Sequence, residues 1–408
     1  MSDSLVLSDC AVICSAGDTR SLLSNLSQGP QQGSERVGGS LSYCEEWLKN
    51  RGGYFGVVEM PDPQIQSTSS QVNSKANSKA NSKANSKTNQ LLTLLADELK
   101  PSIDRLKREY SPSNLVVIIA TTTTGMNNVE TASDHTLIDY HDDQEMSSCS
   151  SFLANYCGID GASVAVSTAC TSGAKVFGLA QQLIDGGWFD AAIVGASESL
   201  CRMTCQGFDS LESYSDGIAR PFQSRRDGIN IGEGAALFVL EKGASGIIMS
   251  GYGESSDAYH ESAPDPSGKG AESAILAALA SANCSAEDID YINLHGTGTP
   301  LNDAMEAGVI SRIFGQKTRV STTKPAMEHT LGAAGAIEAA VLWLLLKDND
   351  CSKLPVQSLL GDLDPDLPKL NFVATNNAGK VSLTRVLSTS FAFGGHNTAL
   401  ILQRTDAE

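Results

Sequence analysis

Two stretches of the chain, one in each half, repeat a short pattern where a strand is expected to lead into a helix. Residues 166–170 (VSTAC) precede a helical stretch that runs to about Asp185, and residues 320–324 (VSTTK) precede another that runs to about Lys347. Repeats at equivalent points are the signature of an internal duplication. We therefore expect two copies of one α/β unit, residues 1–242 and 243–408, with the functional site between them.

Short runs of β-branched residues alternate with longer stretches of small helix-forming residues, which is typical of an α/β fold. The runs expected to form buried strands are 5–14, 115–120, 163–167, 191–194, 236–240, 247–250, 291–294, 319–322 and 398–402.

The charge and the cysteines exclude several functions. A net charge of −18 disfavours nucleic-acid binding. The 10 cysteines lack the spacing of a disulfide framework, and without a CxxC pair no metal site is expected. Residues 5–14 lack the basic start of a signal peptide, and no apolar run is long enough to span a membrane. We therefore expect a soluble cytoplasmic protein.

Residues 73–89 are a low-complexity segment of Asn-Ser-Lys-Ala repeats, with lysines at positions 75, 79, 83 and 87. A segment of this composition is interpreted as a solvated surface insertion. The alternative is a basic arm that binds an acidic carrier.

Cys170 is the candidate nucleophile. It lies where the strand 163–167 turns into a helix that begins near Thr171. The positive end of the helix dipole favours a thiolate at such a position.

Two histidines accompany this cysteine. His295 ends the strand 291–294 and is followed by Gly-Thr-Gly-Thr-Pro, and His329 directly precedes a small-residue helix that contains Glu338. Both were expected where a strand gives way to a helix, so one cysteine and two histidines should meet at a common edge of the sheet.

Five blocks, in this order, resemble those of the β-ketoacyl-ACP synthases of the thiolase superfamily. They are residues 167–174, 226–235, 294–300, 324–338 and 391–397. The blocks at 294–307 and 390–397 are most similar to discrete ketosynthases of aryl polyene-type pathways. The resemblance implies a thiolase-like fold in which two βαβαβαββ halves form a five-layered α-β-α-β-α sandwich.

The resemblance also implies an acyltransferase (EC 2.3.1-type) that condenses malonyl-ACP with an enzyme-bound acyl group. Cys170 would carry the acyl group, and the backbone N–H groups of Cys170 and Phe393 would form an oxyanion hole. His295 and His329 would stabilise the enolate formed when malonyl-ACP loses CO₂. Lys324 and Glu338 would form a supporting ion pair that orients the second histidine.

Further positions match substrate-handling residues of the family. Thr297 and Thr299 would bind the pantetheine arm, and Phe393, Gly394 and Gly395 would form a gate. No cofactor is implied, because the substrates are carried on the phosphopantetheine of ACP.

Three residues depart from the family pattern: Glu328 and Ala392 replace common glycines, and His396 replaces a common threonine. A carboxylate beside His329 could raise the pKa of that histidine, restrict the backbone or weaken activity. We expect Glu328 to perturb the chemistry without abolishing it. A Glu328→Gly variant with condensation faster by orders of magnitude would instead indicate a nearly inactive subunit.

Two alternatives remain. A chain-length-factor-type partner subunit is non-catalytic and usually lacks the nucleophile, whereas a thiolase needs a second cysteine near the C-terminus, where this chain has none after Cys351. The expected partners are acyl carrier protein and a second ketosynthase-like subunit, in a homodimer or a heterodimer with a chain-length-factor relative. Strand 163–167 would lie at that interface.

Overall fold

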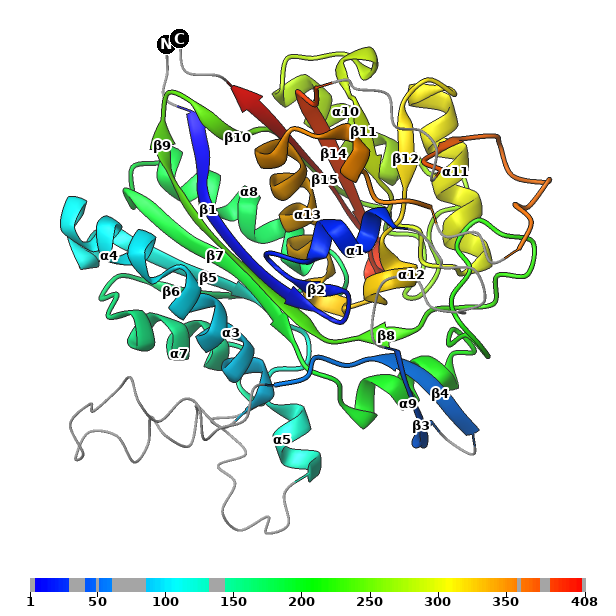
Figure 1. Ribbon diagram of the computed structural model, residues 1–408, viewed down its shortest axis with the longest axis horizontal. Coiled ribbons are helices and arrows are strands. Elements are labelled where there is room, and N and C mark those ends of the chain that lie inside the picture. The colour runs from blue at the N-terminus through cyan, green and yellow to red at the C-terminus, as the bar shows by residue number, and fades with distance from the viewer. Residues whose placement is uncertain are drawn as a thin grey trace.

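The computed structural model describes residues 4–28, 41–48, 51–60, 86–131, 144–357, 361–374 and 382–405, with one large sheet and one small sheet (Figure 1). The strands of the large sheet, in spatial order, are β13 (Asn371–Phe372), β12 (Arg319–Ser321), β11 (Tyr291–Asn293), β14 (Arg385–Phe391), β15 (His396–Thr405), β10 (Gly246–Ser256), β1 (Ser4–Cys14), β9 (Gly234–Gly243), β7 (Ala191–Glu198), β5 (Leu115–Ala120) and β6 (Ser163–Val166). A short β2 (Gly17–Asp18) pairs with β1.

This sheet consists of two copies of one strand arrangement. The order β1-β9-β7-β5-β6 matches β10-β15-β14-β11-β12, and in both copies the first two pairings are antiparallel and the next two parallel. The copies meet where β1 pairs with β10. Since β6 corresponds to β12, the repeated sequence pattern lies at equivalent strand ends, as the duplication predicted.

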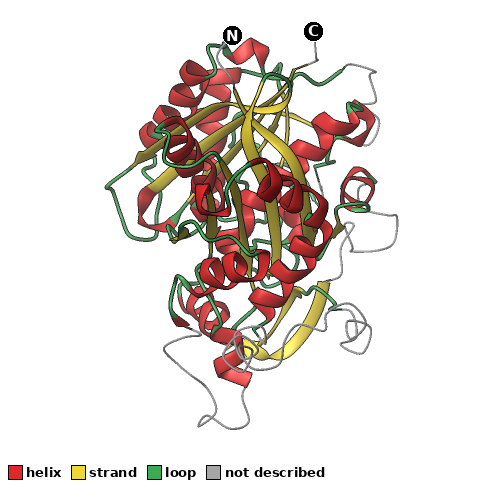
Figure 2. Cartoon of the chain, turned by 90° about the vertical axis from the view of Figure 1, so that its left-hand side faces the viewer, coloured by secondary structure: helices red, strands yellow, loops and turns green. Residues whose placement is uncertain are grey.

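Helices lie on both sides of the strands (Figure 2). The helices are α1 (Leu22–Ser27), α3 (Lys87–Glu98), α4 (Lys100–Glu109), α5 (Met126–Thr131), α7 (Ser148–Cys157), α8 (Ser172–Asp185), α9 (Arg202–Ser210), α10 (Lys269–Ser281), α11 (Pro300–Phe314), α12 (Lys324–Met327) and α13 (Ala334–Asp348).

Alternate residues of the buried strands define the layers, because successive side chains point to opposite faces. In β5, Val116 and Ile118 pack with α8 and α13, whereas Val117 and Ile119 pack with α3, α4 and α7. The other copy packs its second face on α10 and α11. With α8 and α13 in the middle, the expected five-layered α-β-α-β-α sandwich is confirmed.

The small sheet consists of β3 (Leu41–Leu48), β4 (Arg51–Gly56) and β8 (Ile231–Gly232). Its apolar side chains, such as Phe55 and Ile231, pack with Cys205 of α9 and with Leu331. This sheet therefore contacts the segment that follows His329.

Three expectations on local structure need correction. Most of the low-complexity segment, residues 73–85, lies outside the described residues. Lys87 begins α3, and Thr88 and Asn89 are buried. The end of the segment is therefore part of a packed helix and not of a surface insertion. The helix expected from residue 324 to 347 is interrupted between α12 and α13. His329 thus lies between two helices and not after a strand.

Within the described ranges, no helix combines the length and the apolar character that crossing a membrane requires.

Candidate active site

Cys170 lies at the turn between β6 and α8, as predicted. The preceding Ala169 has a φ of 52°, in the left-handed region that non-glycine residues rarely adopt. The Ser172 hydroxyl holds this turn: it donates to the Ala169 carbonyl over 2.6 Å and accepts from the N–H of Thr168 over 2.7 Å. The turn therefore presents the Cys170 thiol at the start of α8.

Burial disfavours the ionised form of the Cys170 thiol. Its side chain is 6% exposed, and burial raises the pKa of the thiol to about 12, with only partial compensation by the charge of Lys324. Desolvation in this pocket therefore opposes the thiolate that the helix N-terminus is expected to favour. The thiol proton must leave when a substrate is attacked.

His295 lies just beyond β11, at the C-terminal edge of the sheet, where two side chains anchor its backbone. Its N–H donates to Glu306 Oε1 over 2.7 Å and to Thr389 Oγ1 over 3.1 Å. The N–H of Gly296 donates to Glu306 Oε2 over 2.7 Å. These bonds fix the turn from which the imidazole projects.

Glu306 and Asp303 of α11 support the site and were not among the predicted residues. Burial raises the pKa of Glu306 to about 7 and that of Asp303 to about 6. Asp303 accepts from the N–H groups of Gly298 (3.2 Å) and Phe222 (2.8 Å). A signal did exist: two acidic residues one helical turn apart, directly after a glycine-rich turn whose N–H groups need acceptors.

The two imidazoles share one tautomer. Their ring centroids are 5.4 Å apart with planes nearly perpendicular. Nδ1 of His329 accepts from the N–H of Leu331 over 3.2 Å, and Nδ1 of His295 lies 3.3 Å from the Lys324 ammonium, which can only donate. Each ring therefore carries its hydrogen on Nε2.

Both imidazoles are also neutral. Burial and the charge of Lys324 lower the pKa of His295 and of His329 well below 6.5. Each Nε2–H is consequently a neutral donor.

Lys324 and Glu338 form the predicted ion pair, at 2.6 Å and fully buried. Burial raises the pKa of the Glu338 carboxyl, and the Lys324 ammonium opposes that rise. The direct contact of Lys324 is with His295, however, and Nδ1 of His329 accepts from the N–H of Leu331. The reason is that His329 lies beyond the end of α12, whereas Lys324 begins that helix. The charge of Lys324 still lowers the pKa of His329.

A pocket of about 320 Å³ brings most of the predicted residues together. Those that line it are Cys170, His295, Thr297, Thr299, His329 and Phe393. The hydroxyls of Thr297 and Thr299 are 2.9 Å apart. Leu211 and Leu301 also line the pocket and are 53% and 59% exposed, so the lining of the pocket reaches the surface.

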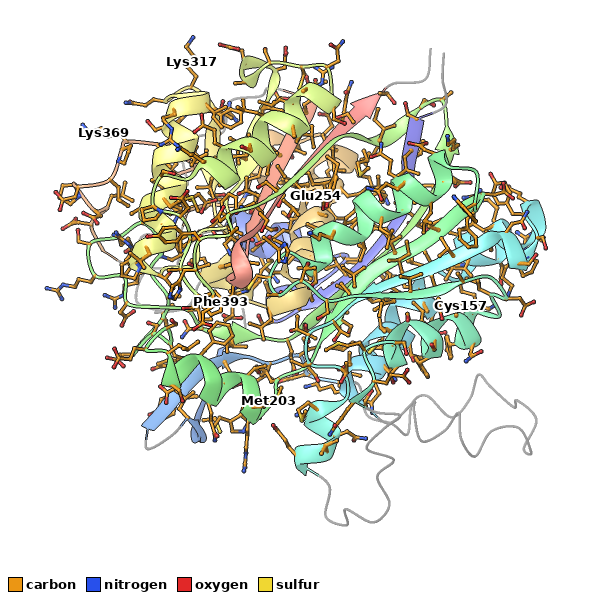
Figure 3. The ribbon with its side chains drawn as sticks, turned by 180° about the vertical axis from the view of Figure 1, so that it is seen from behind. Cys157, Met203, Glu254, Lys317, Lys369 and Phe393 are labelled. Atoms are coloured by element: carbon orange, nitrogen blue, oxygen red, sulfur yellow. The ribbon has the colours of Figure 1, made fainter. Side chains whose placement is uncertain are left out.

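Phe393 begins a short 3-10 turn, Phe393–Gly395, at the end of β14 (Figure 3). Its ring centroid lies 5.4 Å from that of Phe208 in α9. Gly394 and Gly395 have φ values of 81° and 76°, so the turn uses the conformational freedom of glycine that the prediction assigned to it.

Ala392 and His396, which depart from the family pattern, adopt ordinary backbone conformations. Ala392 is extended, with a φ of −133°, a conformation that any residue adopts. Its N–H donates to the carbonyl of His396 over 2.8 Å.

Glu328 does not act on His329 in the way considered from the sequence. Its carboxyl bonds to Ser15, and the pKa of His329 is lowered, not raised. The expected effect on the backbone is present, because Glu328 has a φ of 57°.

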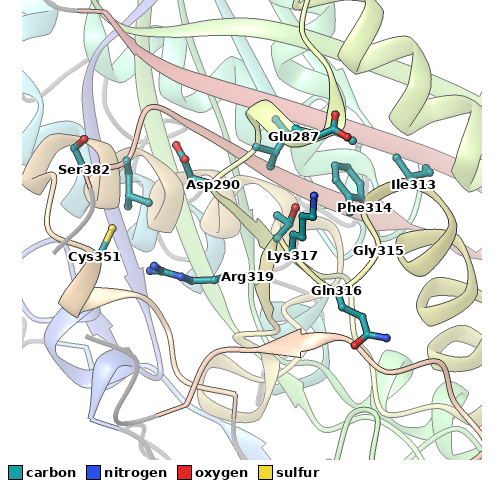
Figure 4. Close-up of a pocket in the computed structure, with 14 residues that line it drawn as sticks. Glu287, Asp290, Ile313, Phe314, Gly315, Gln316, Lys317, Arg319, Cys351 and Ser382 are labelled. Atoms are coloured by element: carbon teal, nitrogen blue, oxygen red, sulfur yellow. The ribbon is translucent and has the colours of Figure 1, made fainter. Parts of the chain in front are cut away.

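A second hollow of about 480 Å³ lies among the loops before β11, β12 and β14 and contains none of the predicted residues (Figure 4). Its charged side chains are of both signs, including Asp290 and Arg319.

Two family models match consecutive parts of the chain. "Beta-ketoacyl synthase, N-terminal domain" matches residues 76–245, and "Beta-ketoacyl synthase, C-terminal domain" matches residues 247–354.

Curated relatives carry the name 3-oxoacyl-[acyl-carrier-protein] synthase 2. The protein of Staphylococcus aureus (strain COL) is 35% identical over 267 residues, which are 61% of this chain and 63% of that protein. The protein of Rhizobium meliloti (strain 1021) is 38% identical over 258 residues, 59% of this chain and 60% of that protein. The chain thus spans less than two thirds of the length of these relatives.

Solved structures match over the whole chain. A complex of a ketosynthase (ApeO) with its chain length factor (ApeC) from Xenorhabdus doucetiae matches with a TM-score of 0.86 and 36% identity, over 99% of this chain and 98% of that one. A β-ketoacyl synthase from Burkholderia phymatum shares the fold, with a TM-score of 0.80 and 22% identity over 99% of this chain and 100% of that one.

A duplicated sheet with one cysteine and two histidines in a shared pocket defines the thiolase-like condensing fold. The chain belongs to the β-ketoacyl synthase family.

Proposed function

We propose that this chain is a β-ketoacyl-ACP synthase that joins an acyl group on Cys170 to a two-carbon unit from malonyl-ACP. One observation carries the proposal: a thiol shares a pocket with two neutral imidazoles whose Nδ1 atoms are both occupied. The Nε2–H groups of His295 and His329 are therefore the donors left for a substrate oxygen.

Acylation comes first. The Cys170 sulfur attacks the carbonyl carbon of an acyl-pantetheine thioester, a new C–S bond forms, and the pantetheine sulfur leaves and takes up the proton lost by the thiol. Backbone N–H groups of Cys170 and Phe393 would stabilise the oxyanion of the tetrahedral intermediate, since donors aimed at a developing charge lower the barrier most.

Condensation follows when malonyl-ACP occupies the pocket. The bond to the malonyl carboxylate breaks, CO₂ leaves, and the electron pair forms an enolate whose oxygen accepts from both Nε2–H groups. The enolate carbon then attacks the Cys170 thioester, and the cysteine sulfur departs with the electrons of the broken C–S bond. Neutral donors suit this step because no proton has to be abstracted.

The remaining predicted residues would serve these steps. The Lys324–Glu338 pair keeps the His295 ring neutral and oriented. Thr297 and Thr299 would bond to the pantetheine arm, and the turn from Phe393 to Gly395 would move between the two stages. The substrates arrive covalently attached to pantetheine, so the proposal includes no bound cofactor.

We infer acyl carrier protein and a second ketosynthase-like subunit as partners. The structure that is 36% identical is a ketosynthase in complex with its chain length factor, which favours a heterodimer. The edge strand β6 is only partly buried, and an uncovered edge of this kind readily pairs with another chain. The sequence resemblance points to an aryl polyene or related polyunsaturated chain. All 10 cysteines are free, which suits the cytoplasm.

Intact-protein mass spectrometry tests the proposal. A panel of acyl-ACPs should add one acyl mass to the wild type and none to Cys170→Ala, and malonyl-ACP should then remove it as the β-ketoacyl product. The assay is run with and without a chain-length-factor candidate from the same source. A Cys170 that stays unmodified by every donor and by an alkylating inhibitor would make the chain a non-catalytic partner, and condensation of acetyl-CoA without malonyl-ACP would make it a thiolase.

A further inference from the structure

The Glu328 side chain lies beside Ser15 of the segment after β1 and beside two glycines of the small sheet. Ser15, just after β1, donates its hydroxyl to Glu328 Oε2 over 2.5 Å. Gly56 of β4 and Gly232 of β8 pair directly across the small sheet. A Cβ atom at Gly56 would collide with Glu328 Oε2, and one at Gly232 would lie 3.0 Å from the Glu328 Cβ. Glycine at both positions therefore leaves the room that the glutamate fills.

The backbone of Glu328 is held in a conformation that glycine normally adopts, with φ at 57° and ψ at −178°. Such a conformation persists only where the surroundings impose it. The next residue, His329, is bonded on both sides to the same segment: its N–H donates to the Asn230 carbonyl over 2.8 Å, and its carbonyl accepts from Gly232 over 3.1 Å. The His329 backbone is thus bonded to the segment around β8, and Glu328 packs against that segment at Gly232.

Burial favours the neutral form of the Glu328 carboxyl. Glu328 is 3% exposed, burial raises its pKa well above 4.5, and Oε1 has no hydrogen-bond partner among the described residues. Its contribution therefore comes from shape and from the bond to Ser15, not from a charge. An amide of the same shape should replace it.

We propose that Glu328 is a positioning residue for condensation: its bond to Ser15 and its packing on Gly56 and Gly232 fix the backbone that aims His329 into the pocket. The proposal rests on the function proposed above. It assigns Glu328 no contact with the reacting atoms, because its carboxyl bonds to Ser15 and neither residue lines the pocket.

Two half-reactions separate this role from general stability: acylation of Cys170 by acyl-ACP, followed by mass, and release of CO₂ from malonyl-ACP. Glu328→Ala and Ser15→Ala should each slow CO₂ release by about 10- to 100-fold, as expected when a catalytic group is displaced by a fraction of an ångström to an ångström. Acylation should stay within about twofold of wild type, since His329 acts in the decarboxylation step. Glu328→Gln, whose amide oxygen can accept from Ser15, should restore CO₂ release to within about threefold. The double variant should be no slower than Glu328→Ala, because both changes remove one interaction.

The matched control is Ser150→Ala, which removes a buried hydroxyl that donates to the Ser147 carbonyl in α7. Both half-reactions should remain at wild-type rates in this control. The inference is overturned if both alanine variants release CO₂ at the wild-type rate, or if acylation falls in parallel with CO₂ release. A wild-type protein that acylates Cys170 but releases no CO₂ from malonyl-ACP would refute the proposed function itself.

Discussion

Burial, more than charge pairing, sets the state of the residues that line the pocket. It raises the pKa of the Cys170 thiol and lowers the pKa of both imidazoles, while the buried ion pair of Lys324 and Glu338 contacts His295 through Lys324. In the proposed reaction, a pocket lined by neutral donors receives a negative charge during decarboxylation. Donors that are already oriented stabilise that charge without reorganisation.

The histidine tautomers are directly testable. Nitrogen NMR of histidine-labelled protein at pH 7 should show an unprotonated Nδ1 and a protonated Nε2 for His295 and His329, and the same state well below pH 6.5. Below pH 6.5 both histidines bind protons in the unfolded chain but stay unprotonated in the folded protein, because their folded-state pKa values are lowered. The free energy of unfolding should therefore fall as the pH decreases through this range. His295→Gln and His329→Gln assign the signals. Either ring titrating with a midpoint near 6.5 would contradict the prediction.

The Lys324–Glu338 pair predicts a stability effect. Lys324→Met leaves a carboxyl buried without its partner and should lower the free energy of unfolding by about 3–5 kcal/mol. Adding Glu338→Leu should restore most of this loss, because both polar groups are then gone. Urea denaturation measures the effect. The control is Lys100→Ala, which breaks an exposed pair with Asp104 and should leave the free energy of unfolding nearly unchanged. Equal losses in Lys324→Met and Lys100→Ala would contradict the assignment.

At the scale of helices and strands, the sequence predicts elements whose residues are buried on both faces. The run 115–120 is β5 to the residue. The strand β14 escaped prediction because residues 388–390 are Ser-Thr-Ser, which look like a loop although all three are buried. Their polarity serves the site, since Thr389 accepts from the backbone of His295.

The break between α12 and α13 was also not predicted from the sequence. Residues 328–330 are Glu-His-Thr, without the glycine or proline that signals a helix end. The interruption lies where contacts with distant segments occur: Glu328 bonds to Ser15, 313 residues away in the chain, and the His329 backbone bonds to Asn230 and Gly232. A local pattern does not contain those contacts.

The turn Phe393–Gly395, proposed above to move between the two stages, can be tested by a glycine substitution. Gly395 has a φ of 76°, and a Cβ added there would lie 3.0 Å from the Asp257 Cβ. Gly187 has a φ of 70° with nothing within 4 Å among the described residues. Both Gly395→Ala and Gly187→Ala should lose about 1–2 kcal/mol of stability from the positive φ. Only Gly395→Ala should also slow acylation of Cys170, by about tenfold, because the turn must shift away from Asp257. Mass spectrometry and urea denaturation give the two readouts, and unchanged acylation in Gly395→Ala would count against a gating turn.

For the molecule as a whole, the duplication explains why the reactive groups meet. Cys170 follows β6 of one copy and His295 follows β11 of the other, and their shared middle layer of α8 and α13 brings these ends to one pocket. The repeat and the three reactive residues are visible in the sequence. The contacts that tune them, such as Lys324 to His295 and Ser15 to Glu328, depend on how distant segments pack, so they required the structure.

The contact between α8 and α13 should determine how firmly the two copies are joined. A Cβ at Gly335 of α13 would lie 2.7 Å from the backbone nitrogen of Ala174 in α8, and backbone atoms cannot rotate away as a side chain can. Gly335→Ala should therefore lower the free energy of unfolding by about 1–3 kcal/mol, although alanine favours helix. The matched control is Gly207→Ala in α9, where no atom of the described residues lies within 4 Å of an added Cβ. The only effect expected there is the better helix propensity of alanine, which should raise the free energy of unfolding by about 0.5–1 kcal/mol. Urea denaturation compares the two variants. Because one hydrophobic core contains residues of both copies, each variant should still unfold in a single transition. A gain of stability in Gly335→Ala like that of Gly207→Ala would mean that the middle layer is more loosely packed than these distances require.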